Sequence, residues 1–111
     1  MSKIFHLLRA LRLAEKEAGI GELDLRGREL LRLIGEEEAQ GTAPMVTGLV
    51  SQSGLGTAPT VFNALKDLES KGWIERVVDE QDGRARRIML SQRARTAFAR
   101  VARKLGAELR K

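Results

Sequence analysis

The 111-residue sequence lacks cysteine and contains a single histidine, His6. Without cysteine the chain forms no disulfide and offers no thiolate ligand or thiol nucleophile, which fits a reducing compartment. One histidine excludes the usual multi-histidine metal sites and most histidine-based acid–base machinery. The sequence also shows no phosphate-binding glycine loop with its lysine and no metal-ligand spacing. We therefore expect no catalytic site, no metal site and no cofactor, and His6 is interpreted as a packing or surface residue.

Long apolar runs are also missing. No stretch approaches the roughly 20 apolar residues that a membrane-spanning helix requires, and the N-terminus lacks the continuous apolar segment of a signal peptide. These absences predict a cytoplasmic protein without membrane contact. The length fits one domain rather than a two-lobed enzyme with a cleft between its lobes. Hydrophobic residues make up 42% and charged residues 32% of the chain, which is typical of a folded globular protein.

Charge is distributed unevenly along the chain. Residues 1–83 carry 10 basic and 14 acidic residues, a net charge of −4, whereas residues 84–111 carry 10 basic and 1 acidic, a net charge of +9. This asymmetry favours a polyanionic partner, most often nucleic acid. The alternative is a basic, solvated helix without a partner. Charges in the last segment can also pair with the acidic cluster at 36–38.

Hydrophobic periodicity and capping residues predict helices over 2–18, 24–38, 47–52 and 57–71, two strands over 73–78 and 86–90, and a last helix from 91. A tight turn with Gly54 and Gly56 separates the third helix from the fourth. This order predicts a mostly α fold with a small β-hairpin wing, the winged helix-turn-helix. The single domain, 1–111, divides into an N-terminal helix (1–20), a winged DNA-binding core (24–90) and a C-terminal dimerisation helix (91–111).

A set of residues in this core carries a family resemblance. It comprises Leu49-Val50, Thr60-Val61, Leu65, Leu68-Glu69, Lys71-Gly72-Trp73-Ile74-Glu75-Arg76, Asp79-Glu80-Gln81-Asp82-Gly83-Arg84 and Arg87-Ile88-Met89-Leu90-Ser91. The stretch from Val46 to Ser91 resembles the DNA-binding core of the MarR family of bacterial regulators. Gln81 stands where the family's Asp-x-Arg-Asp-x-Arg wing signature has an arginine. The resemblance implies a homodimer, interlocked through its terminal helices, that binds double-stranded DNA.

The helix predicted from residue 57, here called the recognition helix, supplies candidate DNA-reading residues. These are Thr57, Ala58, Pro59, Thr60, Asn63 and Lys66. Asparagine can bond an adenine edge bidentately, threonine hydroxyls reach bases or phosphates, and small apolar groups touch thymine methyls. Lys66, two turns into the helix, is expected at a phosphate. The alternative for Thr57 is a simple helix cap, and for Pro59 the stiffening of the turn.

The predicted wing carries the arginines that the exposed positions of the recognition helix lack. Arg84, Arg86 and Arg87 suit the narrow minor groove or its flanking phosphates. One of Arg86 and Arg87 must face the opposite side of the strand, which favours Arg84 and Arg86 for this contact. The alternative is that the acidic residues of the turn pair with these arginines.

The terminal helices are predicted to form a dimer interface. Its candidate residues are Phe5, Leu8, Phe98, Val101, Leu105 and Leu109. The winged core buries its own helices without the last helix, so an apolar face of this size is expected to meet a second copy. The alternative is a monomer in which both terminal helices pack on their own core.

These observations together predict a homodimeric, double-stranded DNA-binding transcriptional regulator that acts as a repressor. One alternative is a replication or partition factor of a mobile element. Another is a winged-helix module for protein–protein contact, which predicts a neutral or apolar recognition face. A small-molecule effector is compatible with the sequence, although no motif indicates one.

Overall fold

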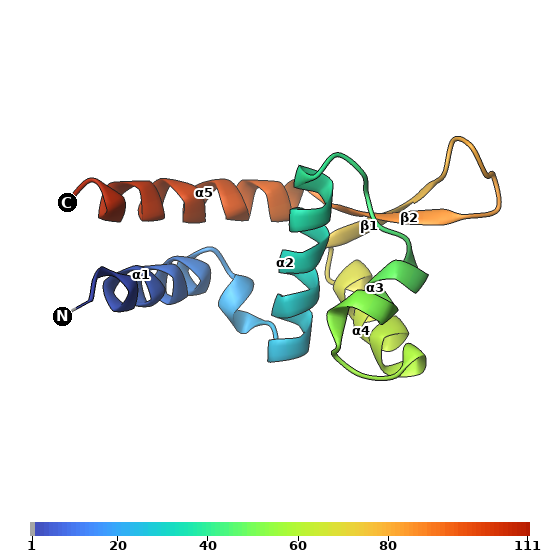
Figure 1. The fold of residues 1–111 in the computed structure, drawn as a ribbon, viewed down its shortest axis with the longest axis horizontal. Coiled ribbons are helices and arrows are strands. Elements are labelled where there is room, and N and C mark those ends of the chain that lie inside the picture. Colours follow the sequence, from blue (N-terminus) through green and yellow to red (C-terminus); the bar gives the residue numbers. More distant parts are fainter. Residues whose placement is uncertain (1) are drawn as a thin grey trace.

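The structure is a computed structural model that describes residues 2–111 (Figure 1). Met1, the first residue of the predicted N-terminal segment, lies outside the described residues. In chain order the elements are α1 (Lys3–Glu17), the short 3-10 helix η1 (Ile20–Glu22), α2 (Leu25–Ala39), α3 (Val46–Ser53), α4 (Ala58–Ser70), β1 (Ile74–Val78), β2 (Arg86–Leu90) and α5 (Gln92–Leu109). The predicted mostly α fold with a β-hairpin wing is confirmed.

Side-chain caps determine where three of the helices begin. The Ser2 hydroxyl accepts a hydrogen bond from the backbone N–H of Ile4 at 3.3 Å, and the Asp24 carboxylate accepts one from Gly27 at 2.7 Å. The Ser91 hydroxyl accepts from the N–H of Ala94 and donates to a backbone carbonyl, which fixes the start of α5. Each cap satisfies an N–H group that has no partner within its helix.

Helix α2 occupies the centre of the molecule, with α1 and α5 on one side and α3, α4 and the hairpin on the other (Figure 1). Its inward residues Leu30, Leu31 and Ile34 are fully buried. The larger side chains that share this core include Ile20, Leu49, Val61, Leu65, Leu68, Trp73, Ile74 and Ile88. Burial of each large apolar side chain contributes about 1.5–3 kcal/mol, so this single core holds the winged elements in place.

The segment before α3 extends the two-stranded sheet. Strands β1 and β2 pair antiparallel, from Ile74 opposite Leu90 to Val78 opposite Arg86. On the other edge of β2, the N–H of Ile88 donates to the carbonyl of Pro44 at 2.8 Å, and Met45 forms an isolated bridge with Arg87. The entry to α3 is therefore fixed directly to a strand of the wing.

Helices α1 and α5 lie side by side and antiparallel, and together they project from the winged core as a terminal helix pair (Figure 1). The Lys3 ammonium near the start of α1 donates to the carbonyl of Glu108 near the end of α5 at 3.2 Å. Both ends of the chain consequently lie at the same end of the molecule.

The terminal helix pair corrects one part of the sequence interpretation. The apolar face of α5 was expected to be uncovered, but Ala94, Ala97 and Val101 are buried within the chain, and Phe98 and Leu105 are half-buried against the core. The cause is that α1 is apolar around much of its circumference. One side covers α5, and the other side presents large apolar residues to solvent.

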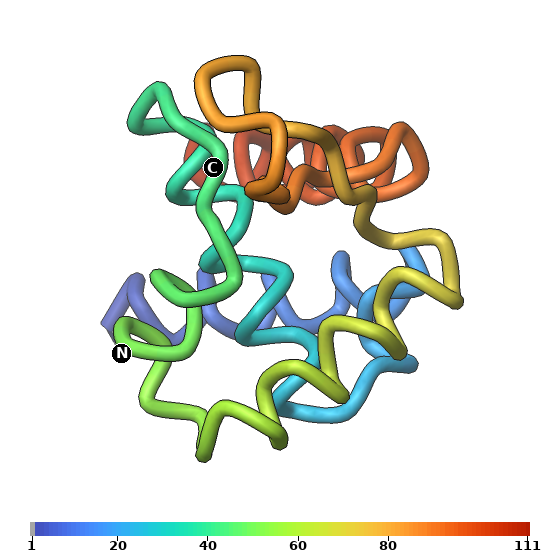
Figure 2. Tube along the Cα trace, turned by 90° about the vertical axis from the view of Figure 1, so that its right-hand side faces the viewer, coloured from blue at the N-terminus to red at the C-terminus, as the bar shows by residue number. Residues whose placement is uncertain are grey.

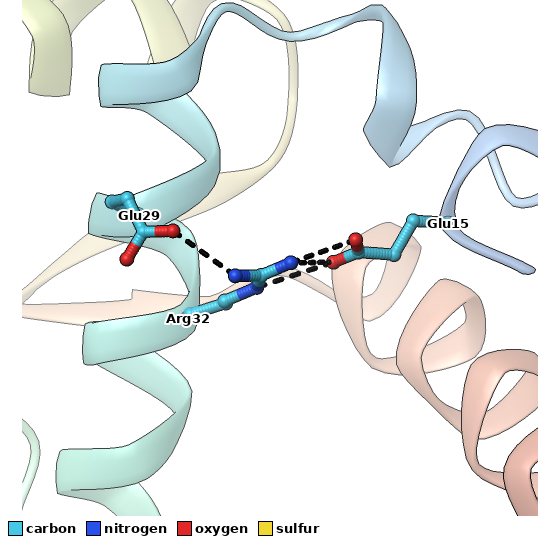
Figure 3. A network of polar contacts seen from close by, with 3 residues as sticks. All are labelled: Glu15, Glu29 and Arg32. Carbon is cyan, nitrogen blue, oxygen red and sulfur yellow. Dashed lines mark hydrogen bonds and ion pairs between the residues drawn. The ribbon is translucent and has the colours of Figure 1, made fainter. Parts of the chain in front are cut away.

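An ion pair connects this terminal helix pair to the core (Figure 3). Glu15 of α1, 2% exposed, meets the guanidinium of Arg32 of α2, with the shortest N···O distance at 2.7 Å. Arg32 also pairs with the exposed Glu29 at 3.0 Å.

Within residues 2–111, no helix combines the length and the apolar character that crossing a membrane would demand.

Candidate DNA interface

The turn between α3 and α4 is shaped by two glycines. Gly54 has φ 64° and Gly56 has φ 139°, both in the region that glycine adopts without strain. A Cβ at Gly56 would also lie 3.0 Å from the Thr60 methyl carbon. Arg26 of α2 holds the turn from outside, because its Nε donates to the carbonyl of Leu55 at 2.9 Å. The turn thus sets the angle at which α4 leaves α3.

Three elements gather at the end of the molecule farthest from the two chain termini. Viewed from that end, α3, α4 and the wing hairpin lie in front, and the terminal helix pair lies behind them (Figure 2). Helix α4 packs through its buried residues Val61, Leu65 and Leu68. Its opposite face, with Pro59, Asn63 and Lys66, is exposed. An exposed helix face of this kind has dimensions that a major groove about 12 Å wide admits.

The two threonines at the start of α4 bond to each other. Their hydroxyl oxygens, Oγ1 of Thr57 and Oγ1 of Thr60, lie 3.1 Å apart. Thr57 is the N-cap residue by position, but its side chain makes no hydrogen bond to the helix backbone. Thr57 and the neighbouring Ala58 are exposed, whereas Thr60 is half-buried with its methyl group against Gly56. Because only one of the two hydroxyls donates in this bond, the pair can still donate one hydrogen bond to a ligand and accept others from it.

Asn63 lies at the edge of the exposed face of α4 that is nearest to α2. It borders a polar hollow of about 330 Å³ together with Asp24, Arg26 and Asp67. The Asp67 carboxylate pairs with Lys71 at 2.9 Å, so its charge is offset within the helix. Asn63 itself remains exposed, with amide groups that can both donate and accept.

The other side of α4 carries a residue that the sequence interpretation missed. Phe62 is 37% exposed, and its ring lies between two cations. The Lys66 ammonium is 4.8 Å from the ring centroid, and the Arg76 guanidinium carbon of β1 is 5.3 Å from it. Arg76 also donates to Glu69 at 3.0 Å. The sequence could have indicated this residue, because Phe62 is an aromatic residue that directly follows Val61 and therefore lies outside the buried stripe of the helix.

The wing presents Arg84 and Arg86 to solvent. The Asp82 carboxylate accepts the backbone N–H of Arg84 at 3.0 Å and so shapes the turn. The Arg86 guanidinium donates to the carbonyls of Gly83 and Ala85 at 3.2 and 3.3 Å. Over the described part of the chain, neither guanidinium forms an ion pair with a carboxylate. Both charges are therefore free to meet phosphates.

Arg87, also a candidate for DNA contact, points back to the body of the protein. Its Nε donates to the Asp79 carboxylate at 3.1 Å and its Nη1 to the carbonyl of Ala43 at 2.6 Å. The side chain is 28% exposed. Arg86 and Arg87 thus alternate between the two faces of β2, as the sequence predicted, and Arg87 is committed to internal partners.

Basic residues near the start of α5 are also held within the chain. Arg93 donates to the carbonyl of Lys71 and stacks over the Trp73 ring at 4.0 Å. Arg95 pairs with Glu38 at 2.8 Å, in agreement with the expected pairing to the acidic cluster at 36–38. The excess positive charge of the C-terminal segment is consequently not all available to an external partner.

These elements define a winged helix-turn-helix protein: α3 and α4 form the helix-turn-helix, and β1 and β2 with their connecting turn form the wing. The MarR family model matches residues 29–85, more than half of the chain, and the chain belongs to the MarR family. Members of this family are DNA-binding transcriptional regulators rather than enzymes. No curated protein sequence matches the chain significantly.

Solved structures share the fold at low sequence identity. A mutant of S. aureus MepR bound to an oligodeoxyribonucleotide is 22% identical with a TM-score of 0.67, and the match covers 96% of this chain and 72% of that one. The transcriptional regulator Tm0710 from Thermotoga maritima is 15% identical with a TM-score of 0.70, over 96% and 72%. CouR from Rhodococcus jostii RHA1 bound to p-coumaroyl-CoA is 22% identical with a TM-score of 0.62, over 93% and 67%.

Proposed function

We propose that this chain binds double-stranded DNA as a homodimer and represses transcription by occupying its site. The observation that carries the proposal is the placement of two different surfaces at opposite ends of the molecule. Helix α4 and the wing lie at one end, and the terminal helix pair, which carries exposed large apolar residues, extends to the other (Figure 1). A twofold axis near the terminal helices would present two α4 helices to one duplex.

The proposed contacts follow from the chemistry of each exposed group. Asn63 bonds a base edge in the major groove, and the hydroxyls of Thr57 and Thr60 bond bases or phosphates. Ala58 and Pro59 bring the helix start close to the bases, and Lys66 meets a phosphate. The wing residues Arg84 and Arg86 reach the minor groove or its flanking phosphates. Arg87 positions the wing instead of touching DNA.

The proposed dimer interface comprises the exposed apolar residues of the terminal helix pair. Of the eight large hydrophobic residues exposed within residues 2–111, five belong to α1 and α5: Ile4, Phe5, Leu8, Leu13 and Leu109. Phe5 and Leu109 are 62% and 61% exposed. Phe98 and Leu105 contribute only their outer edges, and Val101, which is buried within the chain, supports the interface from beneath. Large apolar side chains left exposed on two neighbouring helices are typical of a protein–protein contact.

The experiment that tests this function is the selection of bound duplexes from a random pool, combined with the particle mass of the resulting complex. We expect two equivalent half-sites and a mass of two chains per duplex. If Lys66, Arg84 and Arg86 of both copies each neutralise one phosphate, log affinity falls with log salt at a slope of about −5. A flat salt dependence, or no enriched sequence, would contradict the proposal. A reporter gene whose promoter carries the selected site distinguishes the roles: the protein should lower its expression if it is a repressor and leave it unchanged if it is a replication or partition factor.

A further inference from the structure

A shallow apolar groove runs between α3 and the start of α4. Its lining residues are Val46, Thr47 and Val50 from α3 and Ala58, Pro59 and Phe62 from α4, around a volume of about 510 Å³. None of these six side chains carries a charge, and Ala58, Pro59 and Phe62 are exposed to solvent. Both helices belong to the end of the molecule that also carries the wing (Figure 2). The groove is thus an apolar strip beside the face that holds Asn63.

The surroundings of the groove identify the chemistry of its occupant. Lys66 and Arg76 place two cations around the Phe62 ring, at 4.8 and 5.3 Å from its centroid. Glu69 pairs with Arg76, which leaves the Lys66 charge without a carboxylate partner among residues 2–111. An apolar strip with cations along one edge fits a polyanion that presents apolar groups close to its charges.

We infer that this groove receives the C5-methyl groups of thymines in the major groove and gives the protein a preference for thymine at defined positions of each half-site. The C5-methyl of thymine is the apolar group that the major groove displays, beside donors and acceptors that Asn63 can read. Lys66, one turn beyond Phe62 on α4, would meet a phosphate that flanks those bases. This inference rests on the proposed DNA-binding function and names the base that one part of the interface reads.

The test replaces single thymines by deoxyuridine in the selected duplex. Each replacement removes one methyl group and leaves base pairing unchanged, and fluorescence anisotropy at fixed salt measures the affinity. We expect the affinity to fall about fourfold at one or two adjacent positions in each half-site, the effect of one apolar carbon returned to water. Thymines outside these positions serve as internal controls and should tolerate the replacement.

Protein variants connect this effect to the groove. In Phe62→Gln, the thymine-to-uracil affinity ratio at the sensitive positions should fall close to one, while the salt slope is retained. Ala58→Ser, a milder change at an exposed position, should lower the same ratio without disturbing the fold. Lys66→Gln is the matched control on α4: affinity should fall for thymine and uracil duplexes alike, and the ratio should stay. Thermal unfolding verifies that all three variants are folded.

The outcomes separate the inference from the function on which it rests. If the protein selects a duplex but no thymine replacement changes the affinity by more than twofold, the groove does not read methyl groups and the DNA-binding function stands. If no duplex is selected, both fail. If Phe62→Gln changes the particle mass of the protein without DNA, the groove is occupied by a second copy, and the thymine assignment is overturned.

Discussion

Glu15 and Arg32 form an ion pair between the terminal helix pair and the core in which only the carboxylate is buried. Two bonds from Arg32 Nη2 reach the two carboxylate oxygens at 2.7 and 2.9 Å, and Nε adds a third at 3.2 Å. The Glu15 side chain is 3% exposed, but that of Arg32 is 36% exposed. These hydrogen bonds to Glu15 are the main reason that the pKa of Arg32 lies above its ordinary value.

The unequal exposure of the two partners predicts unequal effects of removing them. Arg32→Ala leaves a buried carboxylate without its cation, and we expect a loss of about 3–5 kcal/mol in the free energy of unfolding. Glu15→Ala should destabilise less, because Arg32 can turn to water and to Glu29. Urea-induced unfolding measures both variants. The matched control is Glu29→Ala, an exposed partner worth less than about 1 kcal/mol.

The prediction fails if Arg32→Ala destabilises the protein no more than the Glu29→Ala control.

The raised pKa of Arg32 also determines how the stability contributed by this ion pair depends on pH. Because the pKa of a basic group is raised in the folded protein, its stabilising effect is complete at neutral pH. That contribution is lost only as the pH rises through the raised pKa, so no loss of this contribution is expected near neutral pH.

Removal of a wing arginine should weaken binding without changing sequence preference. We expect Arg84→Ala and Arg86→Ala each to lower the affinity for all duplexes by a similar factor and to reduce the salt slope by about one per lost phosphate contact. Arg103→Ala, on the exposed side of α5, is the control with the same change of charge. An equal loss of affinity in Arg103→Ala would show that net charge, and not wing contact, controls binding.

Asn63→Ala should relax the preference at one base position in each half-site. The loss of a bidentate contact to a base edge is worth about 1–3 kcal/mol of discrimination. A repeated duplex selection with the variant measures this effect. Ser70→Ala, in the last turn of α4, is expected to leave the selected sequence intact. An unchanged preference in Asn63→Ala would remove this residue from base recognition.

Charge introduced on the outer side of α1 should separate the dimer. Phe5→Asp and Leu8→Asp place a carboxylate among the exposed apolar residues, and sedimentation should then report monomers. Leu105 is a poorer test position, since it is half-buried against its own core. The control is Leu25→Asp, at a residue of α2 that is 71% exposed. Dimers that persist in both α1 variants would place the interface elsewhere.

Arg87→Ala should lower stability where Arg86→Ala does not. The substitution leaves the Ala43 carbonyl and the Asp79 carboxylate without their donor, at a cost of about 1–3 kcal/mol in the free energy of unfolding. Thermal unfolding compares the two neighbours directly. Equal stability of the two variants would indicate that Arg87 does not position the wing.

The fold could be predicted from the sequence because its signals are local. Capping by Ser2, Asp24 and Ser91 and the spacing of apolar residues determine helix limits within a few positions. The third helix begins at Val46, slightly before the predicted limit, because Met45 at its N-cap makes no side-chain bond that a sequence pattern would reveal.

Features that depend on distant partners could not be predicted. The role of Arg87 comes from a backbone carbonyl 44 residues away, and that of Arg26 from one 29 residues away. Backbone carbonyls are present at every position and leave no mark in a sequence. The surroundings of Phe62 are formed by α3 and by the side chain of Arg76, which come together only in the folded protein. The packing of α1 on α5 could not be predicted either, because α1 has apolar residues on more than one side and only the tertiary structure determines which of them contact α5.

The bonds of β2 to Ala43 and Pro44 fasten the wing to the residues that lead into α3. The base of the wing and the entry to α3 are therefore held at a fixed separation, which in the proposed complex sets how far apart the wing and the helix-turn-helix meet the duplex. Where a duplex does not match this separation, the adaptation would fall to the DNA, so the flexibility of base steps that the protein never touches would enter its choice of site.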